Sequence, residues 1–424
     1  MSRRWTWGAV VAVLGLVAAG GAWWFGAGRA GEPAVGTDAV SLSDPDLVAR
    51  GRYLARVGDC AACHTDRGGA PYAGGHALPT PFGDMAAPNI TPDVETGIGN
   101  WRFADFRRAL HEGRGRDGKL LYPVFPYTSY TRVTREDARA IYAYLKSLPP
   151  VHRPDRPAHL RFPYSLRKGL LAWRALYFDA GEFRPDPDHS ESWNRGAYLV
   201  EGLGHCNECH TTRNRLGGLD ESRFLTGGMI PAQGWFAPGL SMQPGGGLEG
   251  WSRRDVVDLL KTGQSAKGTV VGPMADVVRH STRHMTRADL EAIAVYLESL
   301  PAPPRRDAGT VARASDLNAG GRLYADQCAS CHGDDGRGVA DVYPPLDGNT
   351  SVTGPEGVNA IRTVLLGGFA PVTAAHPQPY SMPPFATRLD DAEVAAVINY
   401  IRQSWSNRAA PVTAQDVERY RWLH

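Results

Sequence analysis

The chain has little net charge and little cysteine, and these shortages exclude several classes of function. Among its 424 residues, 46 Lys and Arg stand against 44 Asp and Glu, which gives a formal net charge of +2. This balance provides no attraction to a polyanion, so we expect no nucleic-acid partner. The sequence also has no nucleotide-binding loop and no nucleophile elbow. We therefore expect no substrate site built from such motifs.

All six cysteines occur in three copies of one pattern, and none is left over. The copies are Cys60-Ala-Ala-Cys63-His64, Cys206-Asn-Glu-Cys209-His210 and Cys328-Ala-Ser-Cys331-His332. Cys-x-x-Cys-His is the attachment motif of c-type haem. The two thiols form thioethers with the haem vinyl groups, and the histidine binds the iron. The sequence therefore predicts three covalently attached haem c groups.

Other interpretations of a Cys-x-x-Cys pair fit this arrangement less well. A zinc ribbon needs two pairs close enough to share one metal ion, whereas these pairs are 146 and 122 residues apart (60 to 206, and 206 to 328). A thioredoxin-like redox pair needs no histidine at the next position. A disulfide framework needs neither the fixed gap nor the histidine.

The sequence around the three motifs also repeats. A helix with a glycine is expected before each motif, at Arg50-Gly-Arg-Tyr53, Arg195-Gly-Ala-Tyr198 and Ala319-Gly-Gly-Arg-Leu-Tyr324. A closing helix with a tyrosine (Tyr144, Tyr296, Tyr400) is expected at 135–147, 287–299 and 390–403, with Thr134 and Thr286 as N-caps. This layout resembles class I cytochrome c, in which the aromatic residue crosses closely over the glycine. We therefore predict a mainly α fold of three tandem class I cytochrome c domains.

The repeats define the predicted domain boundaries. We place repeat one at 47–150, repeat two at 192–301 and repeat three at 315–405. The linker at 151–191 has Leu166, Leu170, Trp173 and Tyr177 at helical spacing within 164–178, which predicts a short helix between repeats one and two. A second linker, 302–314, is rich in Pro and Arg. The C-terminal tail, 406–424, is expected to cover a neighbouring domain or a partner.

The N-terminal segment, 1–30, has the features of an export signal or membrane anchor. Arg3 and Arg4 precede an uncharged run of 20 residues, 7–26. A helix of that length spans a bilayer, and Trp23, Trp24 and Phe25 are typical of an interfacial anchor. We expect an uncleaved membrane anchor, with a cleaved signal peptide as the alternative. In either case the body of the protein is exported.

A proline-containing stretch lies between each haem motif and its closing helix. In cytochrome c folds a proline carbonyl accepts a hydrogen bond from the free ring nitrogen of the iron-bound histidine. This bond fixes the ring and raises its donor strength. The resemblance assigns this role to Pro88, to Pro238 and to one of Pro344 and Pro345.

Methionine is scarce as well, with 7 residues in the chain. A His/Met pair raises the potential of haem iron, and in this fold the methionine lies on the loop before the closing helix. Met274 and Met382 occupy that loop in repeats two and three. Repeat one has Phe125-Pro where repeat three has Met382-Pro, and its one methionine is Met85. Met85 is the candidate ligand there; His76, His111 and an iron without a sixth protein ligand remain open.

Several segments resemble the three-haem cytochrome c subunit of bacterial membrane-bound dehydrogenases. They are Asn-Ile-Thr-Pro-Asp at 89–93, Phe-Pro-Tyr-Thr-Ser-Tyr at 125–130, Trp-Asn-Arg-Gly-Ala-Tyr-Leu-Val at 193–200 and Gly-His-Cys at 204–206. The resemblance implies that the chain is not an enzyme. A partner dehydrogenase oxidises the substrate with its own flavin, quinone or molybdenum cofactor.

The same resemblance implies the route of electron transfer and the location of the protein. They pass through three haems to membrane quinone or to a downstream cytochrome or oxidase, on the periplasmic side of the bacterial inner membrane. The alternative function is a haem enzyme, a peroxidase or a sulfur-compound oxidase, that acts at an open haem 1.

Overall fold

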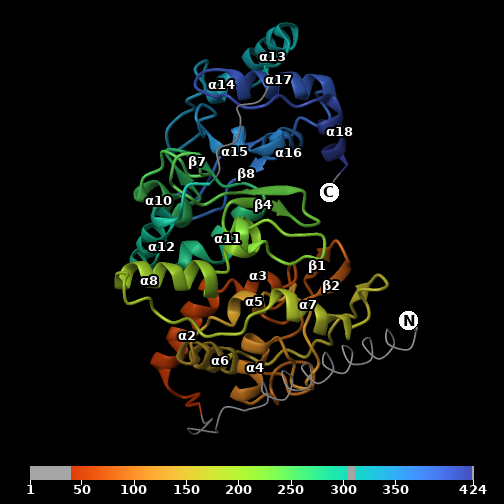
Figure 1. The fold of residues 1–424 in the computed structure, drawn as a ribbon, viewed down its shortest axis with the longest axis vertical. Coiled ribbons are helices and arrows are strands. Elements are labelled where there is room, and N and C mark those ends of the chain that lie inside the picture. The colour runs from red at the N-terminus through yellow and green to blue at the C-terminus, as the bar shows by residue number, and fades with distance from the viewer. Residues whose placement is uncertain (1–39, 304–310, 423–424) are drawn as a thin grey trace, which may run out of the picture. The chain divides into compact units, whose positions relative to one another are not determined.

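The computed structural model describes residues 40–303 and 311–422, so the expected anchor at 1–30 lies outside the described residues. The described residues are mainly helical, with short antiparallel strand pairs between the helices. In Figure 1 the colours run from orange in repeat one through green in repeat two to blue in repeat three. Between 40 and 422, outside the gap at 304–310, no helix has the length and hydrophobicity that crossing a bilayer requires.

Repeat one begins and ends with long helices that enclose shorter elements. Its elements are α2 (Pro45–Val57), α3 (Cys60–His64), β1 (Ala77–Thr80), β2 (Gly83–Ala86), α4 (Phe103–Glu112), α5 (Tyr127–Tyr130) and α6 (Arg135–Ser147). Strand β3 (His159–Leu160) and helix α7 (Gly169–Tyr177) follow in the linker. The strands form one antiparallel sheet in the order β1-β2-β3.

Repeat two has its main helices and first hairpin in the same order, together with additional short elements. They are α8 (Glu191–Ala197), η1 (Tyr198–Leu203), α9 (Asn207–His210), η2 (Glu221–Arg223), β4 (Gly227–Ile230), β5 (Trp235–Pro238), α10 (Arg253–Thr262), β6 (Gln264–Ser265), β7 (Gly268–Thr269), α11 (Pro273–His280), η3 (Thr282–His284) and α12 (Arg287–Ser299). The hairpin β4–β5 corresponds to β1–β2, since both follow the haem motif and end at or just before the proline expected to orient its histidine.

Repeat three has a longer first helix and a different middle. Its elements are α13 (Ala314–Gln327), α14 (Ala329–His332), α15 (Thr350–Thr353), η4 (Pro355–Gly357), α16 (Val358–Leu366), β8 (Gly368–Phe369), β9 (Ser381–Met382) and α17 (Asp391–Gln403), followed by α18 (Ala414–Arg421) in the tail. The predicted closing helices are thus present in all three repeats. Thr134 and Thr286 cap α6 and α12 as expected, because their side chains accept hydrogen bonds from the backbone N–H of Asp137 and Asp289.

A glycine allows the first and last helices of each repeat to cross in contact. An ideal Cβ at Gly51 would lie 1.8 Å from the carbonyl oxygen of Ala140, and one at Gly196 would lie 2.1 Å from that of Ala292. In both crossings the Cβ of the expected tyrosine, Tyr144 or Tyr296, is the next side-chain atom met, at 2.8 Å and 2.7 Å. Only glycine leaves room for backbone at this distance. The predicted aromatic–glycine crossing is therefore confirmed.

Repeats one and two are joined by two equivalent polar contacts. Arg50 of α2 pairs with Asp137 of α6 at 2.6 Å, and Tyr198 of repeat two donates its hydroxyl to the same carboxylate at 2.7 Å. In the other direction Arg195 pairs with Asp289 at 2.8 Å, and Tyr53 of repeat one donates to Asp289 at 2.5 Å. Each repeat thus places a tyrosine hydroxyl on the buried aspartate of the other repeat's salt bridge.

The described residues form two hydrophobic cores, one shared by repeats one and two and one in repeat three. One core runs through repeats one and two and includes Leu54 and Leu145 of the first with Leu199 and Leu290 of the second. Repeat three has a separate core around Ile361, with its own closing helix packed on it.

Repeat three contacts repeat two through a small set of backbone and ring contacts. The side-chain amide of Asn359 both accepts from and donates to the backbone of Phe236, at 3.0 and 2.8 Å. The Arg362 guanidinium lies 5.1 Å from the ring centroid of Trp235. These contacts fix α16 against β5.

The linker helix α7 lies between repeats one and two, and it is shorter than the segment with helical spacing. The helix begins at Gly169, and residues 163–168 form turns. Leu170, Trp173 and Tyr177 face the protein as expected, but Leu166 lies before the helix and is exposed. The predicted helical spacing therefore holds for Leu170, Trp173 and Tyr177 but not for Leu166, which precedes the helix.

The C-terminal tail packs on repeat three, the domain that precedes it in the chain, and its contact with a partner stays a prediction. Arg402 of α17 is buried, and burial lowers its pKa to about 10. Its guanidinium donates to the tail carbonyl of Ala410 at 3.0 Å and to Val352 at 2.6 Å. Asn399 exchanges two hydrogen bonds with the backbone of Val412. The tail therefore supplies acceptors that a buried charge in its own domain requires.

Candidate haem-attachment sites

Each Cys-x-x-Cys-His motif forms one turn of helix directly after the first helix of its repeat. In repeats two and three the histidine N–H donates to the carbonyl of the first cysteine at 3.0 Å, His210 to Cys206 and His332 to Cys328. One such turn brings both thiols and the imidazole to the same side of the backbone. None of the six cysteines is in a disulfide.

The three histidines make the hydrogen bonds that were predicted from their proline stretches. The Nδ1 atoms of His64, His210 and His332 lie 2.7, 2.6 and 3.0 Å from the carbonyl oxygens of Pro88, Pro238 and Pro344. Pro344, and not Pro345, therefore has this role in repeat three. An imidazole that donates from Nδ1 keeps the lone pair of Nε2 for a metal. Burial lowers the pKa of all three imidazoles, which favours this neutral form.

The thiols of the motifs are held in apolar surroundings. Burial raises the pKa of Cys60, Cys63 and Cys206 to about 12, and that of Cys209 and Cys328 to about 11. These thiols are protonated at neutral pH, so they have the weak reactivity of buried cysteine.

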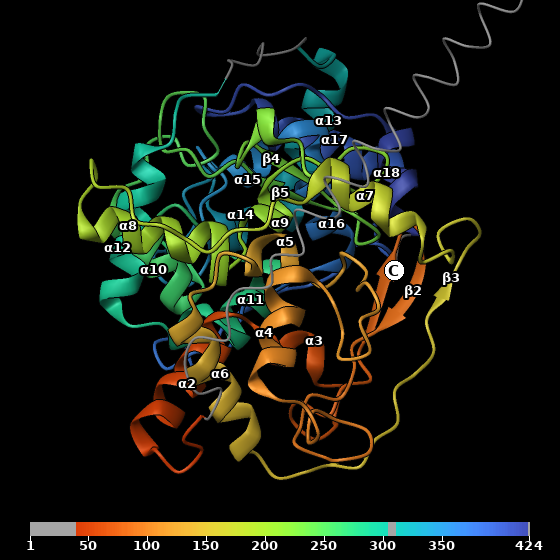
Figure 2. The ribbon, with the colours of Figure 1, turned by 60° about the horizontal axis from the view of Figure 1, so that its bottom comes forward.

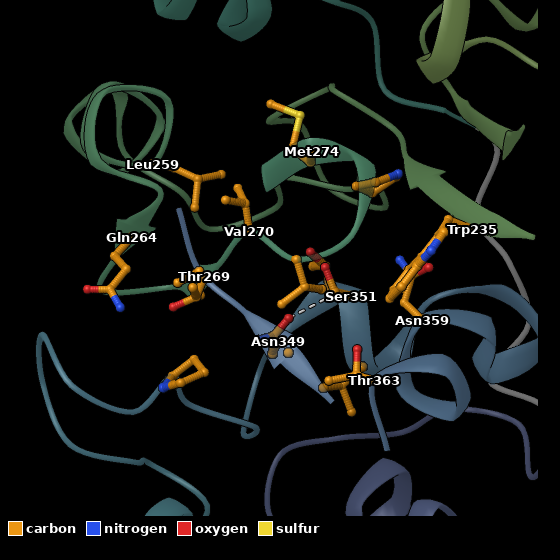
Figure 3. A pocket seen from close by; sticks show the side chains of 18 of the residues that line it. Trp235, Leu259, Gln264, Thr269, Val270, Met274, Asn349, Ser351, Asn359 and Thr363 are labelled. Atoms are coloured by element: carbon orange, nitrogen blue, oxygen red, sulfur yellow. Dashed lines mark hydrogen bonds between the residues drawn. The ribbon is translucent and has the colours of Figure 1, made fainter. Parts of the chain in front are cut away.

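A cavity of about 580 Å³ connects the motifs of repeats two and three. Its wall includes Cys206, His210 and Met274 from repeat two and Cys328, His332 and Met382 from repeat three. Much of the remaining wall is aliphatic or aromatic, with Leu259 and Val270 among its residues. Figure 3 shows Met274 and Trp235 of repeat two around the same pocket as Asn349 and Thr363 of repeat three.

These features fit covalent haem c in chemistry and in shape. The macrocycle needs an apolar cavity, two thiols for its vinyl groups and a histidine whose second nitrogen is held. Repeats two and three provide all of these, and each also places a methionine on the cavity wall. Repeat one provides the same thiols and the same histidine–proline bond.

The expected methionine of repeat one lies on a different element. Met85 is in β2, paired with Leu78, and it precedes by three residues the proline that accepts from His64. The corresponding residue of repeat two is Trp235, in a repeat that also has Met274 on its loop. Trp235 packs against the turn that carries Met274, since an ideal Cβ at Gly272 would lie 2.7 Å from its indole ring. His111 is buried on α4, where its counterpart Lys261 donates to backbone carbonyls.

The loop of repeat one has the same turn as the loop of repeat two but no sulfur. The N–H of Phe125 donates to Tyr122 at 3.1 Å, and the N–H of Ala275 donates to Gly272 at 3.0 Å. Both turns have proline at their second position, so Val124 corresponds to Met274. The ring of Phe125 packs against Tyr130 at 5.5 Å between centroids.

Comparison with known proteins agrees with this geometry. A profile of the cytochrome c family matches residues 48–149 and 317–405. The chain is 39% identical over 420 residues to the cytochrome c subunit of a quinone-type alcohol dehydrogenase of Gluconobacter oxydans, across 94% of this chain and 87% of that protein. The chain belongs to the family of dehydrogenase cytochrome c subunits.

Two further relatives are similar over most of their length. The cytochrome c subunit of gluconate 2-dehydrogenase from Pantoea cypripedii is 39% identical, with 88% of each chain covered. The cytochrome subunit of fructose dehydrogenase from Gluconobacter japonicus is 37% identical, with 88% of this chain and 82% of the relative covered. As a cytochrome c subunit, the chain is an electron-transfer protein and not a catalytic one, and covalent haem c is its cofactor.

In this cytochrome subunit, sequence reasoning missed the residues that join the motifs of repeats one and two. Glu208, inside the second motif, accepts from the hydroxyls of Thr128 and Ser129 of repeat one at 2.7 and 2.8 Å and pairs with Arg213. Burial alone would raise the pKa of Glu208, but Arg213 and the two hydroxyls hold that pKa below its ordinary value. The sequence did carry a signal for this contact, because Glu208 is a carboxylate at a motif position where the other two motifs have alanine or serine.

A second missed pair directly precedes the first cysteine in repeats one and two. Asp59 and His205 both have a positive φ, 53° and 41°, and both line the cavity of repeat two. Burial raises the pKa of Asp59 well above its ordinary value and lowers the pKa of His205. His205 packs edge-on against Tyr130 of repeat one at 5.4 Å between ring centroids. These side chains lie between the two attachment motifs.

Proposed function

We propose that this chain holds three haem c groups in three tandem class I cytochrome c domains, and that it conducts electrons from a partner dehydrogenase to membrane quinone or another respiratory carrier. The observation that supports this most strongly is the threefold recurrence of one site. Each repeat has two thiols, a histidine and a proline carbonyl 2.6–3.0 Å from the histidine Nδ1. Bound haem supplies the one-electron redox chemistry of its iron.

The residues of the chain perform the remaining tasks. The cysteine pairs fix the macrocycle, and the proline carbonyls hold His64, His210 and His332 in one orientation and one tautomer. The apolar wall of the cavity in repeats two and three excludes water, which favours the less charged form of a bound redox group. Met274 and Met382 are the proposed sixth ligands in these repeats.

We further propose a partner and a place for the protein. The names of the relatives indicate a dehydrogenase partner, and its cofactor is of the flavin, quinone or molybdenum type. The uncharged run at 7–26 favours attachment to the bacterial inner membrane, with the repeats on the periplasmic side.

The direct test is a haem count on the purified full-length protein. A pyridine haemochrome assay is expected to give three covalent haem c groups per chain, and mass spectrometry of the complex is expected to identify a dehydrogenase. A count of two or fewer would overturn the three-haem proposal. The Cys63→Ala, Cys209→Ala and Cys331→Ala variants assign any loss to one motif.

Removal of a proposed sulfur ligand gives a separate prediction. Met382→Ala is expected to lower the reduction potential of one haem by on the order of 100 mV, because thioether ligation raises the potential of haem iron. A redox titration followed by optical absorbance measures the shift. Met229→Ala, at an exposed position on β4, is the matched control. An unchanged titration for Met382→Ala would show that another residue binds this iron.

A second function has one observation in its favour. Neither Val124 nor Phe125 carries a donor atom at the turn where repeat two has Met274. We propose that haem 1 lacks a loop methionine. Met85 is the candidate sixth ligand of this haem, and a Met85→Leu variant tests it. An open haem 1 is compatible with a peroxidase or a sulfur-compound oxidase. Spectra with low-spin iron alone, and no reaction with cyanide, would exclude that enzyme.

A further inference from the structure

Helix α7 presents apolar side chains on the face that points away from the protein. Its inner face is Leu170, which is buried, with Trp173 and Tyr177, which are half-buried. Its outer face consists of Leu171, Ala172, Ala175 and Leu176, and all four are exposed. Leu176 is 68% exposed and Leu171 is 45% exposed. Figures 1 and 2 show this helix beside elements of both repeats.

The one charged residue within α7 is turned inward. The guanidinium of Arg174 lies 5.3 Å from the ring centroid of Tyr127 and 4.4 Å from that of Phe178. Burial lowers the pKa of this guanidinium. A surface helix normally has the opposite arrangement, with charge toward water and carbon toward the core. A helix with apolar residues on both faces is ordinarily covered.

The turns before α7 and one loop of repeat two carry further exposed apolar side chains. Phe162 is 80% exposed and Leu166 is 56% exposed, both in the turns that lead into α7. Leu216 of repeat two is 51% exposed, and its carbonyl accepts from the indole N–H of Trp173 at 2.9 Å. We call Phe162, Leu166, Leu171, Leu176 and Leu216 the linker patch. Clustered exposed carbon of this kind marks an interaction site.

The chain segment that carries most of the linker patch is basic, and the carboxylates that act on its Arg167 and Arg174, Asp117 and Glu112, are paired with Lys119 and Arg114. Residues 156–178 contain four Arg and one Lys but no Asp or Glu, in a chain that has 44 acidic residues. Arg161 and Lys168 are exposed beside Phe162 and α7, and Arg215 is exposed beside Leu216. The linker patch therefore suits a partner that offers both apolar and anionic groups.

We propose that the linker patch lies in the headgroup region of a bilayer that contains anionic phospholipids. Such a bilayer offers acyl carbon to the leucines and phenylalanine and phosphate to the adjacent cations in a single surface. A helix that lies in the interface, with Phe, Leu and Trp near Lys and Arg, has this composition. The proposal rests on described residues alone and does not require the segment at 1–30 to span the membrane.

The test measures depth in the bilayer at one residue of the full-length, haem-loaded protein. A nitroxide is attached to the cysteine of a Leu176→Cys variant. The wild-type protein, treated with the same reagent, checks that the six native cysteines do not react. The protein is reconstituted in phosphatidylcholine vesicles with and without phosphatidylglycerol. The ratio of oxygen to nickel-complex accessibility is expected to rise several-fold in the anionic vesicles.

Two controls isolate the cause of the change. The first control is Val94→Cys. Val94 is 59% exposed and is flanked by Asp93 and Glu95, so a label at this position is expected to stay in contact with water in both kinds of vesicle. Arg161→Glu combined with Lys168→Glu, in the Leu176→Cys background, is expected to return the accessibility ratio to the value of the Val94 label. A ratio that stays high in this variant would overturn the electrostatic part of the proposal.

Two outcomes would overturn the proposal as a whole. One is an aqueous label at Leu176 in both vesicles. The other is a label that becomes protected only when the co-purifying dehydrogenase is added, since the linker patch would then be a protein interface. Neither outcome depends on the number of haems, so failure here is distinguishable from failure of the proposed function.

Discussion

The Gly320→Ala variant is expected to lose ~3 kcal/mol or more of folding free energy in repeat three. An ideal Cβ at this position lies 2.1 Å from the carbonyl oxygen of Ala396 and 2.9 Å from the Cβ of Tyr400. Neither atom is the flexible end of a side chain, so the added methyl is accommodated only if α13 and α17 separate. Thermal unfolding of the full-length protein, followed by circular dichroism, measures the loss.

Gly181→Ala adds the same methyl group where there is room for it. No atom of the protein lies within 4 Å of the ideal Cβ at Gly181. A change within ~0.5 kcal/mol is expected for this control. Equal melting curves for the two variants would contradict the idea that the crossing in repeat three tolerates only glycine.

Phe125→Met is expected to give haem 1 a sulfur ligand of the kind proposed for repeats two and three. The Phe125-Pro pair corresponds in sequence to Met382-Pro. We expect a rise in the potential of haem 1 by on the order of 100 mV, together with a new sulfur-to-iron charge-transfer band. Magnetic circular dichroism detects the band, and a redox titration detects the shift.

Two further variants test which position can supply the sixth ligand of haem 1. Val124→Met places sulfur at the position that corresponds to Met274 by the backbone turn, so it tests the neighbouring register. Met85→Leu tests the other candidate, since it removes the one methionine of repeat one. Loss of one band in Met85→Leu, with no new band in Phe125→Met, would assign the sixth ligand to Met85 instead.

Local features of this protein could be predicted from its sequence, because the physics that sets them is local. The caps at Thr134 and Thr286 depend on one side chain and the next turn of backbone. The bonds of Pro88 and Pro238 are not local, since each proline lies 24 or 28 residues after its histidine, and they were expected from the resemblance to cytochrome c. The choice between Pro344 and Pro345 needed coordinates, since adjacent carbonyls point in different directions.

Contacts between distant segments could not be predicted in this way. Tyr198 and Asp137 are 61 residues apart, and neither residue type signals the other. Glu208 looked like an ordinary residue of the second motif, although it is held by two hydroxyls of another repeat. The outward apolar face of α7 was also missed, because the spacing of Leu170, Trp173 and Tyr177 identifies only the inner face.

The exchange of tyrosines between repeats one and two has the geometry of a symmetric homodimer. In an isologous dimer one surface patch meets its own copy, so each contact occurs twice. Here Tyr53 reaches Asp289 while Tyr198 reaches Asp137, and one core fills the space between them. Repeats one and two are in this sense a dimer fused into a single polypeptide, and repeat three is an added subunit with a core of its own. The three haem motifs are therefore distributed over two hydrophobic cores.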